Sequence, residues 1–159
     1  MKTKHFIRLV CVSILLVSCS SLKTTTETIQ KVTQKIESKD FTIRVNQANP
    51  MRMRQIFLTS DYDLRIKKDS AFAYLPYYGV AYVAPYDSNE GGIKFARRMT
   101  AYTVKSKKSS GSWIIHFKVR DTNYNYDFFI DVFNNGSADI TVNSYERDAI
   151  SFTGEMVVD

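Results

Sequence analysis

The 159-residue sequence has little of the chemistry that usually marks a catalytic centre. It contains only two cysteines, two histidines and six glycines. A structural zinc site needs about four cysteine or histidine ligands at defined spacings, and the sequence has no such set. A Gly-x-Ser-x-Gly nucleophile motif is missing as well. We therefore expect no metal, no cofactor and no catalytic residue, and we do not expect the protein to be an enzyme.

The sequence also lacks an apolar run long enough to cross a bilayer, which takes about 20 residues. The apolar stretch at residues 9–17 is much shorter, and it follows the basic residues Lys2, Lys4 and Arg8. A basic start followed by a short apolar stretch is typical of an export signal. Residues 1–18 are therefore predicted to be a signal peptide.

The residues Leu16-Val17-Ser18-Cys19 end this signal and form a lipobox. A branched residue, two small or moderate residues and a cysteine are what lipid transfer and cleavage before the cysteine require. Two or more acyl chains hold a protein firmly on a membrane. We predict that Cys19 carries the lipid and that the protein is a lipoprotein tethered to the membrane outside the cytoplasm.

Cleavage before Cys19 changes the composition on which function depends. It lowers the number of Lys and Arg residues from 22 to 19, against 16 acidic residues, so the net charge falls from +6 to +3. Nucleic-acid binding usually needs a strong and clustered basic charge, so we exclude it. One cysteine and one histidine, His116, remain, and no intrachain disulfide can form.

The mature chain is predicted to be a short tether followed by one domain. Residues 19–26 are polar and form the flexible tether, and residues 27–159 form the domain. Ile29, Val32 and Ile36 recur at helical spacing and predict one short amphipathic helix on the outside of the domain.

After residue 40 the apolar period changes from the helical one to two. About eight to ten short strands are predicted, joined by brief turns that include the hairpin signal Asn134-Asn135-Gly136. This pattern indicates an all-β, mainly antiparallel fold. We favour a lipocalin-like up-and-down β-barrel because closure removes exposed strand edges, and a β-sandwich is the alternative.

The most unusual segment lies between residues 74 and 86. Tyrosine rings offer a broad apolar face and a polar tip, so a cluster can bind a small apolar or sugar-like ligand. In the alternative interpretation the rings pack between strands and close one end of the barrel. The candidate ligand-binding residues are Tyr74, Tyr77, Tyr78, Tyr82 and Tyr86.

Two acidic patterns are weaker candidates. Residues 87–92 resemble the start of a calcium loop, but Gly91 and Arg98 occupy positions where ligands belong. Paired carboxylates could also support a hydrolase, which is the least favoured function. The acids considered for it are Asp61, Asp63, Asp127 and Asp131.

Six further segments join the lipobox in a shared pattern: Tyr62-Asp63-Leu64-Arg65-Ile66, Tyr74-Leu75-Pro76-Tyr77, Ala84-Pro85-Tyr86, Gly91-Gly92-Ile93-Lys94-Phe95, Asn135-Gly136-Ser137-Ala138 and Thr141-Val142-Asn143-Ser144. Together these segments resemble an uncharacterised domain family of Bacteroidota lipoproteins. The resemblance implies a lipocalin-like β-barrel without an established activity. Residues 20–23, Ser-Ser-Leu-Lys, lack the acids that such lipoproteins carry when sent to the cell exterior, which favours the outer membrane facing the periplasm.

Two functions stay open from the sequence. The first is a binding module that holds a small apolar or sugar-like ligand against the tyrosine segment. The second is a structural or accessory envelope protein that acts through contacts with a protein partner.

Overall fold

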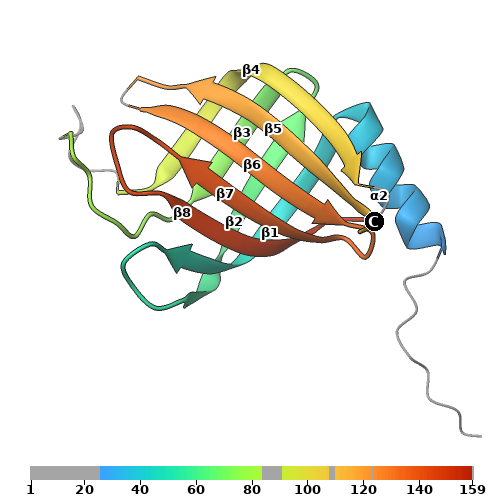
Figure 1. Cartoon of the computed structure of the whole chain (residues 1–159), viewed down its shortest axis with the longest axis horizontal. Helices are drawn as coiled ribbons and strands as arrows, with labels where there is room; N and C mark the ends of the chain where they lie inside the picture. The colour runs from blue at the N-terminus through green and yellow to red at the C-terminus, as the bar shows by residue number, and fades with distance from the viewer. Residues whose placement is uncertain (1–25, 84–90, 108–109, 123, 159) are drawn as a thin grey trace, which may run out of the picture.

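The computed structural model of the chain describes residues 26–83, 91–107, 110–122 and 124–158 (Figure 1). Within these residues one helix precedes eight strands. Their bounds are α2 Thr26–Ser38, β1 Asp40–Pro50, β2 Ile56–Lys67, β3 Ser70–Leu75, β4 Ile93–Lys107, β5 Ser112–Arg120, β6 Asn125–Phe133, β7 Ser137–Asn143 and β8 Ile150–Met156.

The eight strands form one closed barrel in which each strand pairs with its neighbours in the sequence. All pairings are antiparallel, and β1 pairs with β8 to close the barrel. The two closing strands approach tightly, since a Cβ atom on Gly154 would overlap the carbonyl oxygen of Arg44. The predicted up-and-down barrel is therefore confirmed, and the sheet does not split into a sandwich.

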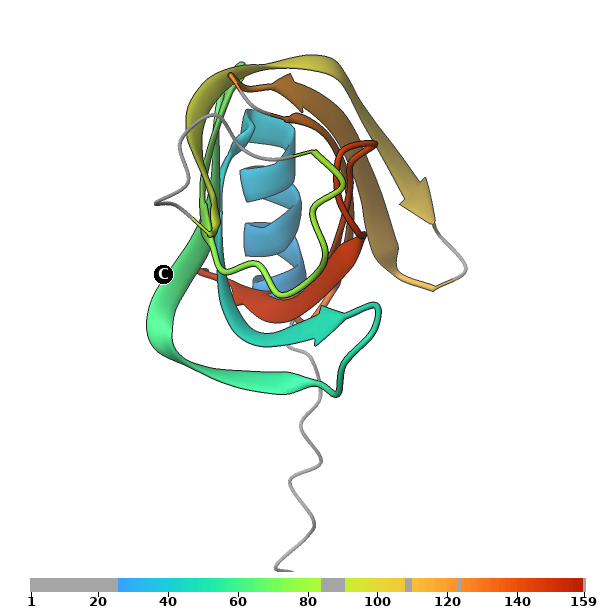
Figure 2. The ribbon, with the colours of Figure 1, turned by 90° about the vertical axis from the view of Figure 1, so that its left-hand side faces the viewer.

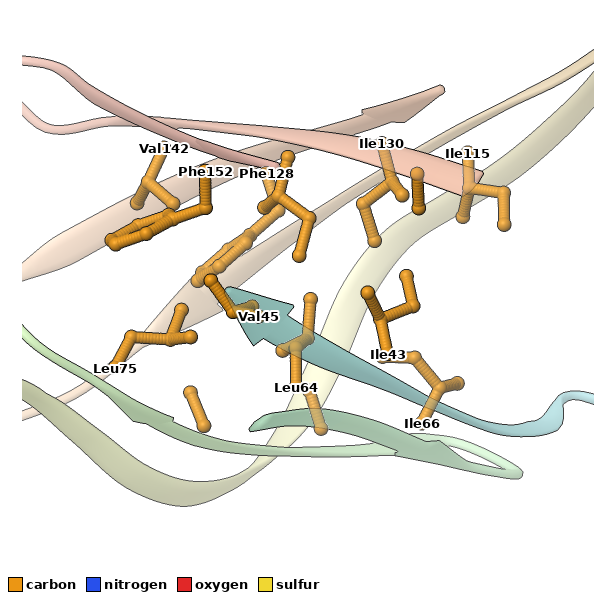
Figure 3. Packing of buried hydrophobic residues seen from close by; sticks show 14 of the residues in the cluster. Ile43, Val45, Leu64, Ile66, Leu75, Ile115, Phe128, Ile130, Val142 and Phe152 are labelled. Carbon is orange, nitrogen blue, oxygen red and sulfur yellow. The ribbon is translucent and has the colours of Figure 1, made fainter. Parts of the chain in front are cut away.

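The inside of the barrel is filled by apolar side chains (Figure 3). Strand residues alternate between the interior and the solvent, as the buried positions of β6 and β7 illustrate. The rings of Phe117 and Phe128 stack with their centres 5.0 Å apart and an angle of 7° between their planes. The barrel therefore has a packed core at its centre, where Phe41 and Phe152 are also fully buried.

Helix α2 lies across the barrel opening at which β1 begins (Figures 1 and 2). The helix lies on the outside of the barrel, as predicted. Its apolar residues Val32 and Ile36 nevertheless face the barrel and are buried. Lys39, with a φ of 52°, ends the helix and turns the chain into β1. No helix in the described ranges is both long and apolar enough to span a membrane.

Two strands are less regular than a simple alternation predicts. Strand β2 is continuous over Ile56–Lys67. The register between β1 and β2 shifts between the pairs Val45–Tyr62 and Gln47–Phe57, which breaks the simple alternation. Strand β4 extends over 15 residues and bends at Ala101, whose φ is 53°.

Candidate functional site

The tyrosine segment crosses the barrel opening opposite α2 (Figure 2). It leaves β3 at Pro76 and is described as far as residue 83. The backbone amide of Tyr82 donates to the carbonyl of Glu146 at 2.8 Å, and that of Asp148 donates to the carbonyl of Val80 at 2.9 Å. The segment is thereby fastened to the connection between β7 and β8, residues 144–149.

The structure distributes the predicted ligand-binding tyrosines over different environments. Tyr74 lies on the outer face of β3, is 47% exposed and stacks on Tyr62 with ring centres 5.3 Å apart. Tyr82 is also exposed, whereas Tyr77 and Tyr78 are half-buried and pack against the core. Tyr86 lies outside the described residues.

Two of these tyrosines share a hollow on the barrel surface. The hollow has a volume of about 240 Å³. The ammonium group of Lys94, which also lines this hollow, lies 5.3 Å from the centre of the Tyr74 ring. The lining residues are Tyr62, Tyr74, Leu75, Pro76, Tyr77, Gly91, Gly92 and Lys94.

Arg147 plugs the barrel beneath the tyrosine segment. It is only 4% exposed, and its guanidinium carbon lies 3.9, 4.4 and 5.0 Å from the ring centres of Tyr124, Tyr77 and Tyr126. It also donates a hydrogen bond to the Tyr126 hydroxyl. Burial lowers the pKa of Arg147, and the electron-rich faces of the rings compensate the cation for the water it has lost.

Asp148 joins three loops at the same end of the barrel. Its carboxylate accepts two hydrogen bonds from Arg52, at 2.8 and 3.3 Å, and one from the Val80 amide at 3.1 Å. The Tyr82 hydroxyl donates to it as well. The bonds from Arg52 and Tyr82 lower the pKa of Asp148 to about 2. Arg147 and Asp148 together thus join the tyrosine segment to the barrel at this opening.

A larger groove lies on the outer wall, near the β5–β6 and β7–β8 connections. Its volume is about 470 Å³, which is within the range of small-ligand sites. None of the predicted tyrosines lines it. The lining residues are Thr100, Lys118, Val119, Arg120, Asn125, Tyr126, Asp127, Phe129, Asn143, Ser144 and Tyr145.

One side of the groove has an aromatic surface held in place by neighbouring side chains. Phe129 is 40% exposed, and its ring stacks on His116 with centres 4.5 Å apart. His116 Nε2 lies 2.5 Å from Asp127 Oδ1, and Lys118 Nζ lies 3.5 Å from Asp127 Oδ2. Phe129 and Asp127 thus present an apolar face and a hydrogen-bonding group side by side.

The opposite side of the groove is held by Glu146. Its carboxylate accepts hydrogen bonds from the Ser144 hydroxyl at 2.5 Å and from the Asn125 side chain at 2.9 Å. The bond from Ser144 is the main reason that the pKa of Glu146 is lowered. Glu146 therefore fixes the orientation of the two groove residues Asn125 and Ser144. Tyr145, which lies beside Ser144 in the chain, is 95% exposed.

Two of the acids considered for a hydrolase form ion pairs. Asp63 pairs with Arg65 at 3.2 Å, and Asp127 pairs with His116 and Lys118. Asp131 lies opposite Asp139 in the β6–β7 register. In the described ranges no three His, Cys, Asp or Glu side chains are placed to hold a metal ion.

Residues 23–156 match the family described as "Domain of unknown function (DUF4251)". The chain belongs to the DUF4251 family. This confirms the resemblance to an uncharacterised domain family. No curated protein matches the sequence.

The crystal structure of a DUF4251 family protein from Bacteroides eggerthii has a similar fold. The two structures superpose with a TM-score of 0.63 and 15% sequence identity, and the match covers 82% of this chain and 87% of that chain. The two DUF4251 proteins therefore share the barrel, although most of their residues differ.

Sequence reasoning missed the residues that close the barrel and those that form the groove. Arg147 and Asp148 lie in a short polar stretch after β7 that has the composition of an ordinary turn. A signal was available in Tyr124, Tyr126 and Phe128, which alternate and place three aromatic rings along one face. The groove has no such signal, because its residues come from four strands and the β7–β8 connection.

Proposed function

We propose that this DUF4251 protein is a lipid-anchored envelope protein that binds a small sugar-like ligand in the groove on its outer wall. The observation that carries the proposal is the exposed ring of Phe129 beside the carboxylate of Asp127 in a groove of about 470 Å³. Sugar rings pack their C–H faces on aromatic rings, while their hydroxyls need hydrogen-bonding groups at the edge.

The polar lining favours a sugar over a purely apolar ligand. Asn125 and Asn143 can both donate and accept hydrogen bonds, as sugar hydroxyls require. Asn125 and Ser144 are already oriented by Glu146, so binding costs little further side-chain ordering. The groove is therefore better suited to a polyhydroxylated ligand than to a fatty one.

The barrel interior offers less support for a ligand. Its central positions are occupied by buried apolar side chains, and Arg147 and α2 close the two openings. The tyrosine segment forms part of this closure, and its hollow at Tyr74 is about half the volume of the groove. We therefore place the ligand on the outer wall, and the filled barrel serves as a rigid support.

The lipid anchor rests on the sequence. Residues 16–19 form the lipobox, and the absence of acids directly after Cys19 favours the outer membrane, facing the periplasm. Metabolic labelling with an alkyne fatty acid should label the wild-type protein and not Cys19→Ser. A labelled Cys19→Ser variant would contradict the anchor.

The binding proposal is tested by calorimetric titration with N-acetylglucosamine, cellobiose and galacturonic acid oligomers. At least one probe should bind with a Kd at or below the millimolar range. Phe129→Ala should weaken that binding at least fivefold, and Phe72→Ala, which removes an exposed ring on β3, should leave it unchanged. No heat from any probe, or equal loss in both variants, would contradict the proposal.

A structural or accessory role through protein contacts is the second candidate. The exposure of Tyr145 favours this role, because the residue is 95% exposed and exposed tyrosines are common at protein–protein interfaces. A site-specific photocrosslinker at Tyr145 should then give one defined protein adduct in intact cells, whereas the binding module predicts none.

A further inference from the structure

The connection between β1 and β2 carries an unusual concentration of exposed apolar side chains. Met51 is 70% exposed, Met53 is 53% exposed and Phe57 is 73% exposed. We call residues 51–57 the hairpin tip. The tip projects from the barrel wall (Figure 2), so these side chains do not pack in the core. Large apolar side chains gathered on one exposed element are typical of a surface that meets a membrane or a protein.

Two arginines alternate with the methionines in the hairpin tip. Arg52 binds Asp148 and thereby fixes the base of the tip. Arg54 makes no ion pair with any other described residue and is exposed. Exposed apolar side chains interleaved with cations suit the boundary of an anionic bilayer, where the apolar groups enter and the cations meet phosphates.

The hairpin tip and the start of α2 lie at opposite ends of the barrel, but both are toward its lower side. In Figures 1 and 2 both the β1–β2 connection and the first turn of α2 are at the lower side of the barrel. Thr26 lies seven positions after Cys19, and a fully extended chain of seven steps spans about 25 Å. A bilayer that runs along this lower side of the barrel meets both the lipid on Cys19 and the hairpin tip.

We infer that the hairpin tip is a membrane-contact element that rests the barrel on an anionic lipid surface. Met51, Met53 and Phe57 enter the boundary between headgroups and acyl chains, and Arg54 binds lipid phosphates. The choice of a membrane as the contacting surface rests on the lipid anchor proposed above. The exposed apolar and basic side chains of the hairpin tip are observed independently of that anchor. Strands β4 and β5 lie on the upper side in both views, so this orientation turns the groove away from the bilayer.

The test uses the lipidated protein in vesicles of phosphatidylethanolamine and phosphatidylglycerol that contain brominated lipids. Phe57→Trp places a reporter on the tip, and Phe72→Trp places a matched reporter on β3. Fluorescence is compared with that of the wild type, which contains one tryptophan, Trp113. Bromine should quench the residue 57 reporter at least twice as strongly as the residue 72 reporter, and Arg54→Glu should remove most of that difference.

Equal quenching at the two positions, or none at either, would overturn the inference. So would a tip reporter that responds to an added envelope protein and not to lipid, because the occupant would then be a protein. The same experiment distinguishes failure of the proposed lipid anchor from failure of the membrane-contact inference. Unlipidated protein at high vesicle concentration should still show stronger quenching at residue 57, and loss of that difference would also overturn the inference.

Discussion

The guanidinium carbon of Arg147 lies 3.9 Å from the centre of the Tyr124 ring, inside the opening of the barrel. Two more tyrosine rings, Tyr77 and Tyr126, complete the surroundings of this cation. No carboxylate among the described residues pairs with it. Arg147 is therefore stabilised by ring faces and one phenol, and it joins the tyrosine segment to the core.

Replacement of Arg147 should destabilise the whole barrel. Arg147→Ala empties a packed site and removes three cation–π contacts, so the free energy of unfolding should fall by about 2–4 kcal/mol. Arg147→Lys keeps the charge but loses the planar stacking, and its loss should be smaller. Urea denaturation monitored by circular dichroism measures both. A change below about 0.5 kcal/mol for Arg147→Ala would contradict this role.

Asp148 should make the barrel opening sensitive to acid. The bonds from Arg52 and Tyr82 lower its pKa from 3.8 to about 2, so the folded state favours the carboxylate. The resulting stabilisation is present above about pH 4 and is lost as the pH falls through about 2. The NMR shift of the Val80 amide, which donates to this carboxylate, should follow that titration. Asp148→Asn should lack it, and an unchanged titration in this variant would contradict the assignment.

The folded protein should become more stable when the hydroxyl of Tyr102 is removed. Burial raises the pKa of Tyr102 to about 12, and its hydroxyl has no hydrogen-bond partner in the described part of the chain. Tyr102→Phe should therefore raise the free energy of unfolding by up to about 1 kcal/mol.

The same residue should show a late alkaline transition. Because the folded pKa is raised, stability from the neutral phenol persists up to about pH 10 and is lost as the pH rises through about 12. An alkaline titration followed by ultraviolet difference absorbance should show one late-titrating tyrosine fewer in Tyr102→Phe than in the wild type. A spectrum identical to that of the wild type would contradict the prediction.

Gly154 should be essential for barrel closure. A methyl group there would overlap the backbone of Arg44 on the paired strand β1. Gly154→Ala should therefore cost about 2 kcal/mol or more, since neither backbone can move without breaking the β1–β8 pairing. Gly91→Ala is the matched control, because no atom lies within 4 Å of its added methyl group. Thermal unfolding should separate the two variants, and equal melting temperatures would refute the close approach.

The sequence predicted the C-terminal half of the barrel well. In β5 and β6 every second residue is large and apolar, and these residues are the ones that the barrel buries. The first half of β4 lacks a clear apolar alternation, because only Ile93 and Met99 of its first seven residues are buried, among Lys94, Arg97 and Arg98. The alternation in β2 was obscured by the register shift opposite Val45.

The candidate site could not be predicted to the same extent. The tyrosine segment is conspicuous in the sequence, but whether its rings bind a ligand or close the barrel depends on where residues 144–149 lie. Arg147 and Asp148 hold these residues against the tyrosine segment, and both look like solvated turn residues in the sequence. The groove depends on the strand register, which brings Lys118 opposite Asp127 and Asp127 opposite Asn143.

The most direct test of the proposed function is an NMR titration of the isotopically labelled protein with the sugar probe that gives heat in calorimetry. The outer-wall site predicts amide shifts confined to the groove, with the largest changes at Asn125, Asp127, Phe129 and Asn143. Shifts confined to residues 74–83, or spread over the buried interior positions, would contradict it.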